Sequence, residues 1–124
     1  MNTTPFFNFA TEGELKDPIT MAFLSFHKEN PHVYRMFRKF ALQATGKRKR
    51  FSARTIVEVM RWNTSIVTDD PEGFKINDHW IPYYSRMFER ELPQWKGFFE
   101  RRGSVVDDDL SVQELDELIR VAGG

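Results

Sequence analysis

The fold is decided by residues 17–46, DPITMAFLSFHKENPHVYRMFRKFALQATG. They predict two consecutive helices whose ends are marked by capping residues and prolines. Asp17 stands before Pro18, and an acidic N-cap followed by proline at the first helical position is a typical helix start. Pro31 ends the first helix, because the residue before a proline avoids the helical conformation. Pro31 is then expected to begin the second helix, which Gly46 ends.

Apolar residues in this stretch recur at helical spacing. In the first helix they are Ile19, Phe23 and Phe26. In the second helix they fall at i, i+4, i+7, i+8 and i+11, namely Val33, Phe37, Phe40, Ala41 and Ala44. Stripes of this kind are typical of helices that bury one face against a core.

A third helix is expected to follow a short basic connection, with Ser52 as its N-cap. The residues expected on its inner face are Ile56, Val59, Met60 and Asn63. Those expected on its outer face are Arg54, Glu58, Arg61 and Ser65. The second helix, the connection and the third helix together resemble a helix-turn-helix in outline.

The segment after the third helix allows two interpretations. Short β-prone runs at 65–68 and 74–76 flank turn-forming residues, which favours a small β-hairpin in the place where a winged-helix protein carries its wing. Alternatively, the third helix runs on to Thr68 and a plain loop follows. A fourth helix is then expected to begin at Asn77 or Asp78.

Three further features complete the expected architecture. The fourth helix carries Tyr84, Met87, Phe88 and Glu91 at helical spacing, and Leu92-Pro93 ends it. Residues 93–101 are expected to form a short helix with Trp95, Phe98 and Phe99 packed inward. Ser111 and Glu114 form a capping box for the last helix, whose apolar edge is Leu115, Leu118, Ile119 and Ala122.

The sequence therefore predicts an all-α or mainly α fold. We expect a compact domain of five to six helices with a helix-turn-helix-like pair. Whether one short β-hairpin is added to these helices is left open by the sequence. The expected division is an irregular N-terminal arm at 1–16, a helical core domain at 17–102, and an acidic linker with a C-terminal helix at 103–124. At 124 residues and 40% apolar residues, one domain can bury a sufficient core.

Composition excludes several classes of protein. The chain has no cysteine, so it forms no disulfide and has no thiol chemistry. Its start does not resemble a secretory signal, and no apolar run approaches the roughly 20 residues of a membrane span. We therefore expect a soluble cytoplasmic protein without membrane contact.

Charge is segregated along a chain whose formal total is zero. Residues 31–61 hold nine Lys or Arg and one acid, Glu58, a net charge of +8. Residues 103–124 hold six acids against Arg120 alone, a net charge of −5. Such segregation favours a surface that faces phosphates. The plain interpretation of the acidic segment is a solvated helix start, where acids suit the helix dipole. The sharper hypothesis is that it covers the basic surface when no ligand is bound, or binds a host protein by imitating phosphates.

The candidate nucleic-acid-binding residues are Lys47, Arg48, Lys49, Arg50, Arg54, Arg61, Trp62 and Lys75. The four residues of the basic connection would hold phosphates, and Arg54, Arg61 and Trp62 would meet the groove. Lys75 would be a wing contact if the hairpin forms. The alternative is a solvated loop in which Arg54 and Arg61 pair with Glu58 along the helix.

No motif predicts catalysis, a cofactor or a metal. The three histidines, His27, His32 and His79, lack metal-ligand spacing and are interpreted as surface or helix-end residues. Phosphate loops, nucleophile elbows and paired-carboxylate motifs are missing from the sequence. We therefore expect a protein that is not an enzyme.

Several segments resemble a recurring group of small proteins encoded by bacteriophages and prophages. They are Phe23–Tyr34, Phe51–Trp62, Phe74–Asn77 and Tyr83–Arg86, and the resemblance covers roughly residues 20–102. The resemblance implies a phage context and a bacterial cytoplasm, and it supplies no catalytic residues.

Two functions remain open from the sequence. The first is a phage-encoded accessory or regulatory protein that binds DNA through the basic connection and the helix after it. The second is a non-enzymatic modulator or inhibitor that binds a host enzyme or defence protein through the acidic segment or an aromatic surface.

Overall fold

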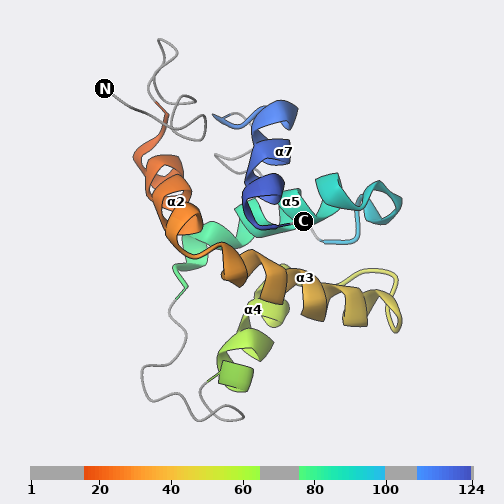
Figure 1. Ribbon diagram of the computed structural model, residues 1–124. Coiled ribbons are helices and arrows are strands. Elements are labelled where there is room, and N and C mark those ends of the chain that lie inside the picture. Colours follow the sequence, from red (N-terminus) through yellow and green to blue (C-terminus); the bar gives the residue numbers. More distant parts are fainter. Residues whose placement is uncertain (1–15, 65–75, 100–108, 124) are drawn as a thin grey trace.

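The computed structural model describes residues 16–64, 76–99 and 109–123, and most of these residues are helical (Figure 1). The α-helices are α2 (Pro18–Glu29), α3 (Pro31–Thr45), α4 (Ala53–Trp62), α5 (Ile81–Glu91) and α7 (Val112–Val121). Two short 3-10 helices are η3 (Asp78–Trp80) and η4 (Pro93–Trp95). The described ranges contain no β-strand, only an isolated bridge between Phe51 and Phe99. The mainly α fold is therefore confirmed.

The predicted helix starts are confirmed by their capping hydrogen bonds. The Asp17 side chain accepts from the backbone N–H of Ile19 at 2.8 Å, and Pro18 is the first residue of α2. Ser52 caps α4 by accepting from the backbone N–H of Thr55 at 3.3 Å. Ser111 and Glu114 form the full capping box of α7. Each cap satisfies a backbone donor that the first turn of a helix leaves without a partner.

Helix α5 is the centre of the molecule. It contacts α3, α4 and α7, and every residue from 83 to 89 is buried. Aromatic rings from several helices meet around it. Tyr84 packs against Phe23 and Phe37, with ring centroids 5.3 and 5.7 Å apart, and Phe88 packs against Phe99 at 5.5 Å. The C-terminal helix belongs to the same core, because Leu118 of α7 is fully buried in it.

The inner face of α4 differs from the predicted one. Ile56 and Met60 are buried as expected, but Val57 is fully buried, whereas Val59 is 39% exposed. The prediction was wrong at Val59 because apolar residues occur on both sides of the stripe. Contact of α4 with both α3 and α5 turns the side that bears Val57 inward.

The predicted helix over 93–101 is also corrected. Only Pro93–Trp95 is helical, and Gly97 at φ +85° then turns the chain. Phe98 and Phe99 are buried as expected, but outside any helix. A glycine in the left-handed region ends a helical turn readily, because it has no Cβ to clash. Residues 100 and 101 lie outside the described part of the chain.

Helices α3 and α4 pack against each other, as a helix-turn-helix-like pair requires. Their connection covers residues 46–52, which is longer than the turn of about three or four residues in a helix-turn-helix. The hairpin proposed for 65–76 and the alternative longer helix both involve residues 65–75, which lie outside the described residues.

Candidate nucleic-acid interface

The basic turn, residues 47–50, is held at both ends by backbone hydrogen bonds. The N–H groups of Lys47 and Arg48 donate to the Ala44 carbonyl at 3.0 and 2.9 Å, which extends the last turn of α3. After the turn, Phe51 N–H donates to the Phe98 carbonyl at 3.0 Å. The backbone of the turn is therefore anchored to the body while its four side chains are exposed.

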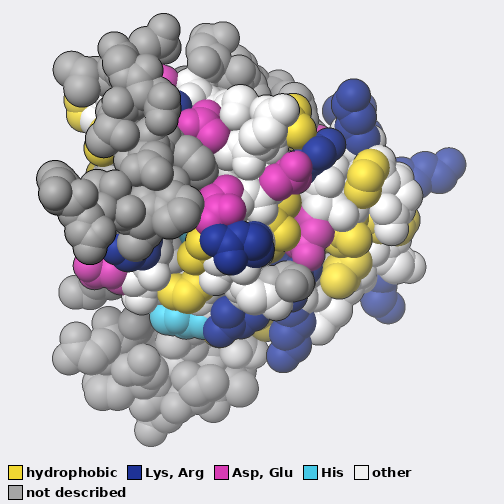
Figure 2. All heavy atoms as spheres, turned by 45° about the horizontal axis from the view of Figure 1, so that its top comes forward, with side chains coloured by type: hydrophobic (Ala, Val, Ile, Leu, Met, Phe, Trp, Pro, Cys, Tyr) yellow, Lys and Arg dark blue, Asp and Glu magenta, His cyan; other side chains and the backbone are white. Residues whose placement is uncertain are grey.

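The charges of the basic turn have no acidic partner among the residues that the structure describes. Lys47, Lys49 and Arg50 form no ion pair with the described residues, and Arg48 donates only to the neighbouring Lys47 carbonyl at 3.2 Å. Lys39, about two turns earlier on α3, is also exposed and lies over the Phe40 ring at 5.6 Å. Uncompensated cations on a surface attract phosphates and other anions. In Figure 2 several Lys and Arg side chains project from the right edge, the side on which Figure 1 shows the α3–α4 connection.

Lys96 is a candidate that the sequence analysis missed. It is exposed and lies two residues before Phe98, whose carbonyl accepts from Phe51 at the end of the basic turn. The hydrogen bond joins segments that are almost fifty positions apart in the chain. The only signal in the sequence was a lysine beside Gly97, and this does not indicate that Lys96 lies near the end of the basic turn.

Arg54 and Arg61 are positioned by Asp78 rather than by Glu58. Arg54 Nη1 lies 3.3 Å from one carboxylate oxygen of Asp78, and Arg61 Nη2 lies 2.9 Å from the other. Arg61 also donates to the Ile76 carbonyl at 2.8 Å. The hydrogen bonds from Arg61 and Arg54 lower the pKa of the Asp78 carboxyl below its usual value. The alternative of pairs with Glu58 is therefore wrong, because the acid comes from η3.

Trp62 is the most exposed large apolar side chain of the described residues, at 62%. Val59, one turn earlier on α4, is 39% exposed and lies on the same side of the helix. Trp62 therefore lies off the buried stripe of α4. Lys75, the remaining candidate contact, lies outside the described residues.

Two other arginines of the +8 segment are engaged elsewhere. Arg35 donates to the Ala122 carbonyl at 2.6 Å, at the C-terminal end of α7. Arg38 pairs with Glu91 at 2.6 Å, and Tyr34 donates to the other oxygen of the same carboxylate at 2.7 Å. The +8 segment is thus distributed over several surfaces. Among the described residues, its turn and Lys39 have no acidic partner, and Arg35 is bound to a backbone carbonyl instead.

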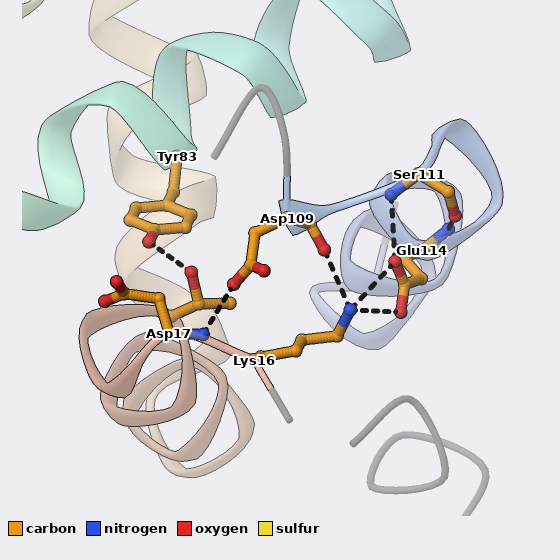
Figure 3. A network of polar contacts seen from close by, with 7 residues as sticks. Lys16, Asp17, Tyr83, Asp109, Ser111 and Glu114 are labelled. Carbon is orange, nitrogen blue, oxygen red and sulfur yellow. Dashed lines mark hydrogen bonds and ion pairs between the residues drawn. The ribbon is translucent and has the colours of Figure 1, made fainter. Parts of the chain in front are cut away.

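The described part of the acidic segment does not cover the basic turn. Lys16 Nζ donates to the Asp109 carbonyl at 2.8 Å and pairs with Glu114 at 3.0 Å. The backbone N–H of Asp17 donates to the Asp109 carboxylate at 3.0 Å (Figure 3). This network ties the start of α2 to the start of α7.

The other two described acids of α7 also have partners. Asp116 pairs with Arg90 at 2.8 Å, and Glu117 pairs with Arg120 on the same helix. Together with the network around Lys16, these pairs account for every acid in 109–123. The expectation that the acidic segment covers the basic surface is therefore wrong for these residues, and 103–108 lie outside the described part.

Of the two interpretations given for the histidines, surface or helix-end, His27 fits the second, because it lies in the last turn of α2, and the first is wrong for it. His27 is fully buried near the end of α2, and its Nε2 lies 2.7 Å from the Leu118 carbonyl. Because a carbonyl only accepts, Nε2 carries the proton. The other two histidines are exposed. Within the described residues no group of three or more His, Cys, Asp or Glu side chains is placed to hold a metal ion.

Comparisons with known proteins give no relative. No family model matches the chain, and neither a curated protein nor a solved structure matches it. In the described part of the chain, no helix has both the length and the apolar character needed to cross a membrane.

Proposed function

We propose that the protein is a phage-encoded accessory or regulatory protein that binds DNA through the basic turn, residues 47–50. One observation carries this proposal. Four consecutive cationic side chains are exposed on a backbone that is anchored at both ends, and none pairs with an acid in the described residues. Such a group can neutralise successive phosphates without first losing an internal partner. The resemblance of Phe23–Tyr34 and Phe51–Trp62 to phage proteins supports the phage context.

The test is a titration of a labelled mixed-sequence DNA duplex by fluorescence anisotropy at several salt concentrations. Each phosphate contact contributes about 0.9 to the slope of log affinity against log salt. Lys47→Ala with Lys49→Ala should therefore lower the slope by about two units. The matched control is Arg90→Ala with Arg120→Ala, which removes the same charge from side chains already paired with acids. Wild-type binding that is absent, or equal sensitivity of the two double variants, would sink the proposal.

A second candidate function is a protein-binding modulator of a host enzyme or defence system. The exposed pair Val59 and Trp62 favours it, because tryptophan is enriched among residues that dominate protein interfaces. Trp62→Ala would then abolish capture of a host protein, whereas Lys47→Ala with Lys49→Ala would leave it intact. Loss of DNA binding alone in Trp62→Ala would assign this side chain to the first function instead.

A further inference from the structure

A second exposed turn, residues 95–98, lies beside the basic turn and carries Lys96 at its tip. This Lys96 turn is a type II β-turn, in which Phe98 N–H donates to the Trp95 carbonyl at 2.9 Å. Lys96 has φ −56° and ψ 131°, and Gly97 has φ +85°. The third position of a type II turn needs a positive φ, which glycine adopts without strain. Gly97 therefore allows the backbone conformation that presents the Lys96 side chain to solvent.

The Lys96 turn is anchored on both sides. Before it, Trp95 N–H donates to the Leu92 carbonyl at 2.9 Å. After it, Phe99 N–H donates to the buried Glu89 carboxylate at 3.1 Å. The Phe98 ring is also buried and packs against the Trp95 ring, with centroids 5.8 Å apart. The backbone of this turn is thus fixed to the core, as that of the basic turn is, while its lysine is exposed.

The two turns are joined directly through Phe51, the residue that follows the basic turn. Its N–H donates to the Phe98 carbonyl at 3.0 Å, and it forms a parallel bridge with Phe99. Two residues of chain span at most about 7 Å, and the hydrogen bond brings the two backbones within about 7 Å, so Lys96 lies within about 14 Å of Phe51. Each strand of a duplex has one phosphate per about 3.4 Å, so this distance spans about four phosphates. Both turns lie on the same side of the molecule in Figure 1 and can reach one stretch of duplex.

The charge of Lys96 has no acidic partner in the part of the chain that the structure describes. The two acids that precede it in the sequence are engaged elsewhere. Glu89 is buried and accepts from Phe99 N–H. Glu91 is paired with Arg38 at 2.6 Å. An exposed cation on an anchored turn can therefore act on an external phosphate without first losing an internal ion pair.

We infer that Lys96 binds a further phosphate of the same duplex, so that the DNA-binding surface is formed by two turns joined through Phe51 and Phe98. This inference rests on the proposed function and extends its site. The partner is the sugar-phosphate backbone of duplex DNA, and the added contact carries no base specificity. Phosphate contacts fix the orientation of a protein on the duplex, and two anchored turns restrict that orientation more than one turn does.

The experiment measures the salt slope of binding to the labelled mixed-sequence duplex for Lys96→Ala, Lys96→Arg and Lys28→Ala. Loss of one phosphate contact lowers the slope by about 0.9, so the loss of affinity between about 50 and 200 mM salt should be about 3.5-fold smaller in Lys96→Ala than in wild type. Lys96→Arg keeps the charge and should keep the wild-type slope. Lys28→Ala is the matched control, because it removes the same charge from α2, away from both turns (Figure 1), and it should also keep the slope.

A combined variant separates this inference from the proposed function. Lys47→Ala, Lys49→Ala and Lys96→Ala together should lower the slope by about 2.7, against about 1.8 for the first two alone. Equal slopes for the double and the triple variant would overturn the inference and leave the proposed function standing. The proposed function has its own readout, since it fails when wild-type binding does not depend on Lys47 and Lys49. Thermal unfolding confirms that every variant folds.

Discussion

The hydroxyl group of Tyr84 should reduce the stability of the fold. Tyr84 is fully buried at the centre of the core, and its hydroxyl has no hydrogen-bond partner in the described part of the chain. Burial raises the pKa of this phenol far above its ordinary value, because loss of contact with water disfavours the charged form. A buried hydroxyl without a hydrogen bond costs about 1–3 kcal/mol.

Tyr84→Phe removes this cost and keeps the ring. The contacts with Phe23, Tyr34 and Phe37, at centroid separations of 5.3, 6.3 and 5.7 Å, do not involve the hydroxyl as a donor. The small void left by the oxygen loses some dispersion contacts, which offsets part of the gain. We therefore expect the free energy of unfolding to rise by about 1 kcal/mol, or the Tm by about 4 °C for a domain of this size.

Tyr34→Phe is the matched control and should have the opposite sign. The Tyr34 hydroxyl donates to Glu91 at 2.7 Å, and hydrogen bonds to charged groups contribute about 1.5–3 kcal/mol. Arg38 stays bound to the same carboxylate, so we expect a loss of about 1–2 kcal/mol. Urea unfolding followed by circular dichroism measures both variants. A loss of more than about 1 kcal/mol in Tyr84→Phe would refute the reasoning, since it would show that the hydroxyl has a partner.

Three further predictions concern ionisation, capping and backbone conformation. Burial lowers the pKa of His27 below 6.5, so the unfolded chain binds the proton more readily. The free energy of unfolding should therefore fall from about pH 7 to about pH 5, and less steeply in His27→Gln; parallel urea titrations measure the difference, and equal slopes would contradict it. Ser111→Ala removes a capping box and should cost about 1 kcal/mol in thermal unfolding, whereas no change would show that the cap is dispensable. Gly97→Ala should cost about 1 kcal/mol because φ is +85°, although nothing lies within 4 Å of the new Cβ, while Gly46→Ala at φ −76° should be neutral or stabilising. Equal Tm values for the two glycine variants would contradict the backbone argument.

Local signals in the sequence predicted the helices. Which side of a helix is buried depended on tertiary contacts, which the sequence does not show. Asp17, Ser52 and Ser111 each bond to a backbone N–H two or three residues ahead, so short patterns suffice to place those helix starts. The buried side of α4 was harder to predict. Val57 and Val59 are chemically equivalent on either side of the stripe, and only contact with α3 and α5 selects between them.

The candidate site shows why a run of basic residues in a sequence overstates the charge available to bind an external anion. The acceptors for Arg35, Arg38 and Arg61 lie 87, 53 and 17 residues away in the chain. A count of charges within one segment cannot include them. These arginines lie along the edges of helices whose apolar faces pack in the core. Their long side chains therefore reach acceptors on the neighbouring elements.

Within the described chain the basic turn has no such acceptors, and its place in the fold is again the reason. Residues 47–50 connect two packed helices and lie outside both, so no neighbouring element of the described chain supplies an acid. Each of these exposed cations keeps its hydration and its long-range field, which reaches about 8–10 Å at physiological salt. Charge carried by an anchored turn therefore gives a stronger argument for a phosphate contact than equal charge on a packed helix. The salt slope of DNA binding should depend on Lys47 and Lys49 before it depends on Arg54 and Arg61.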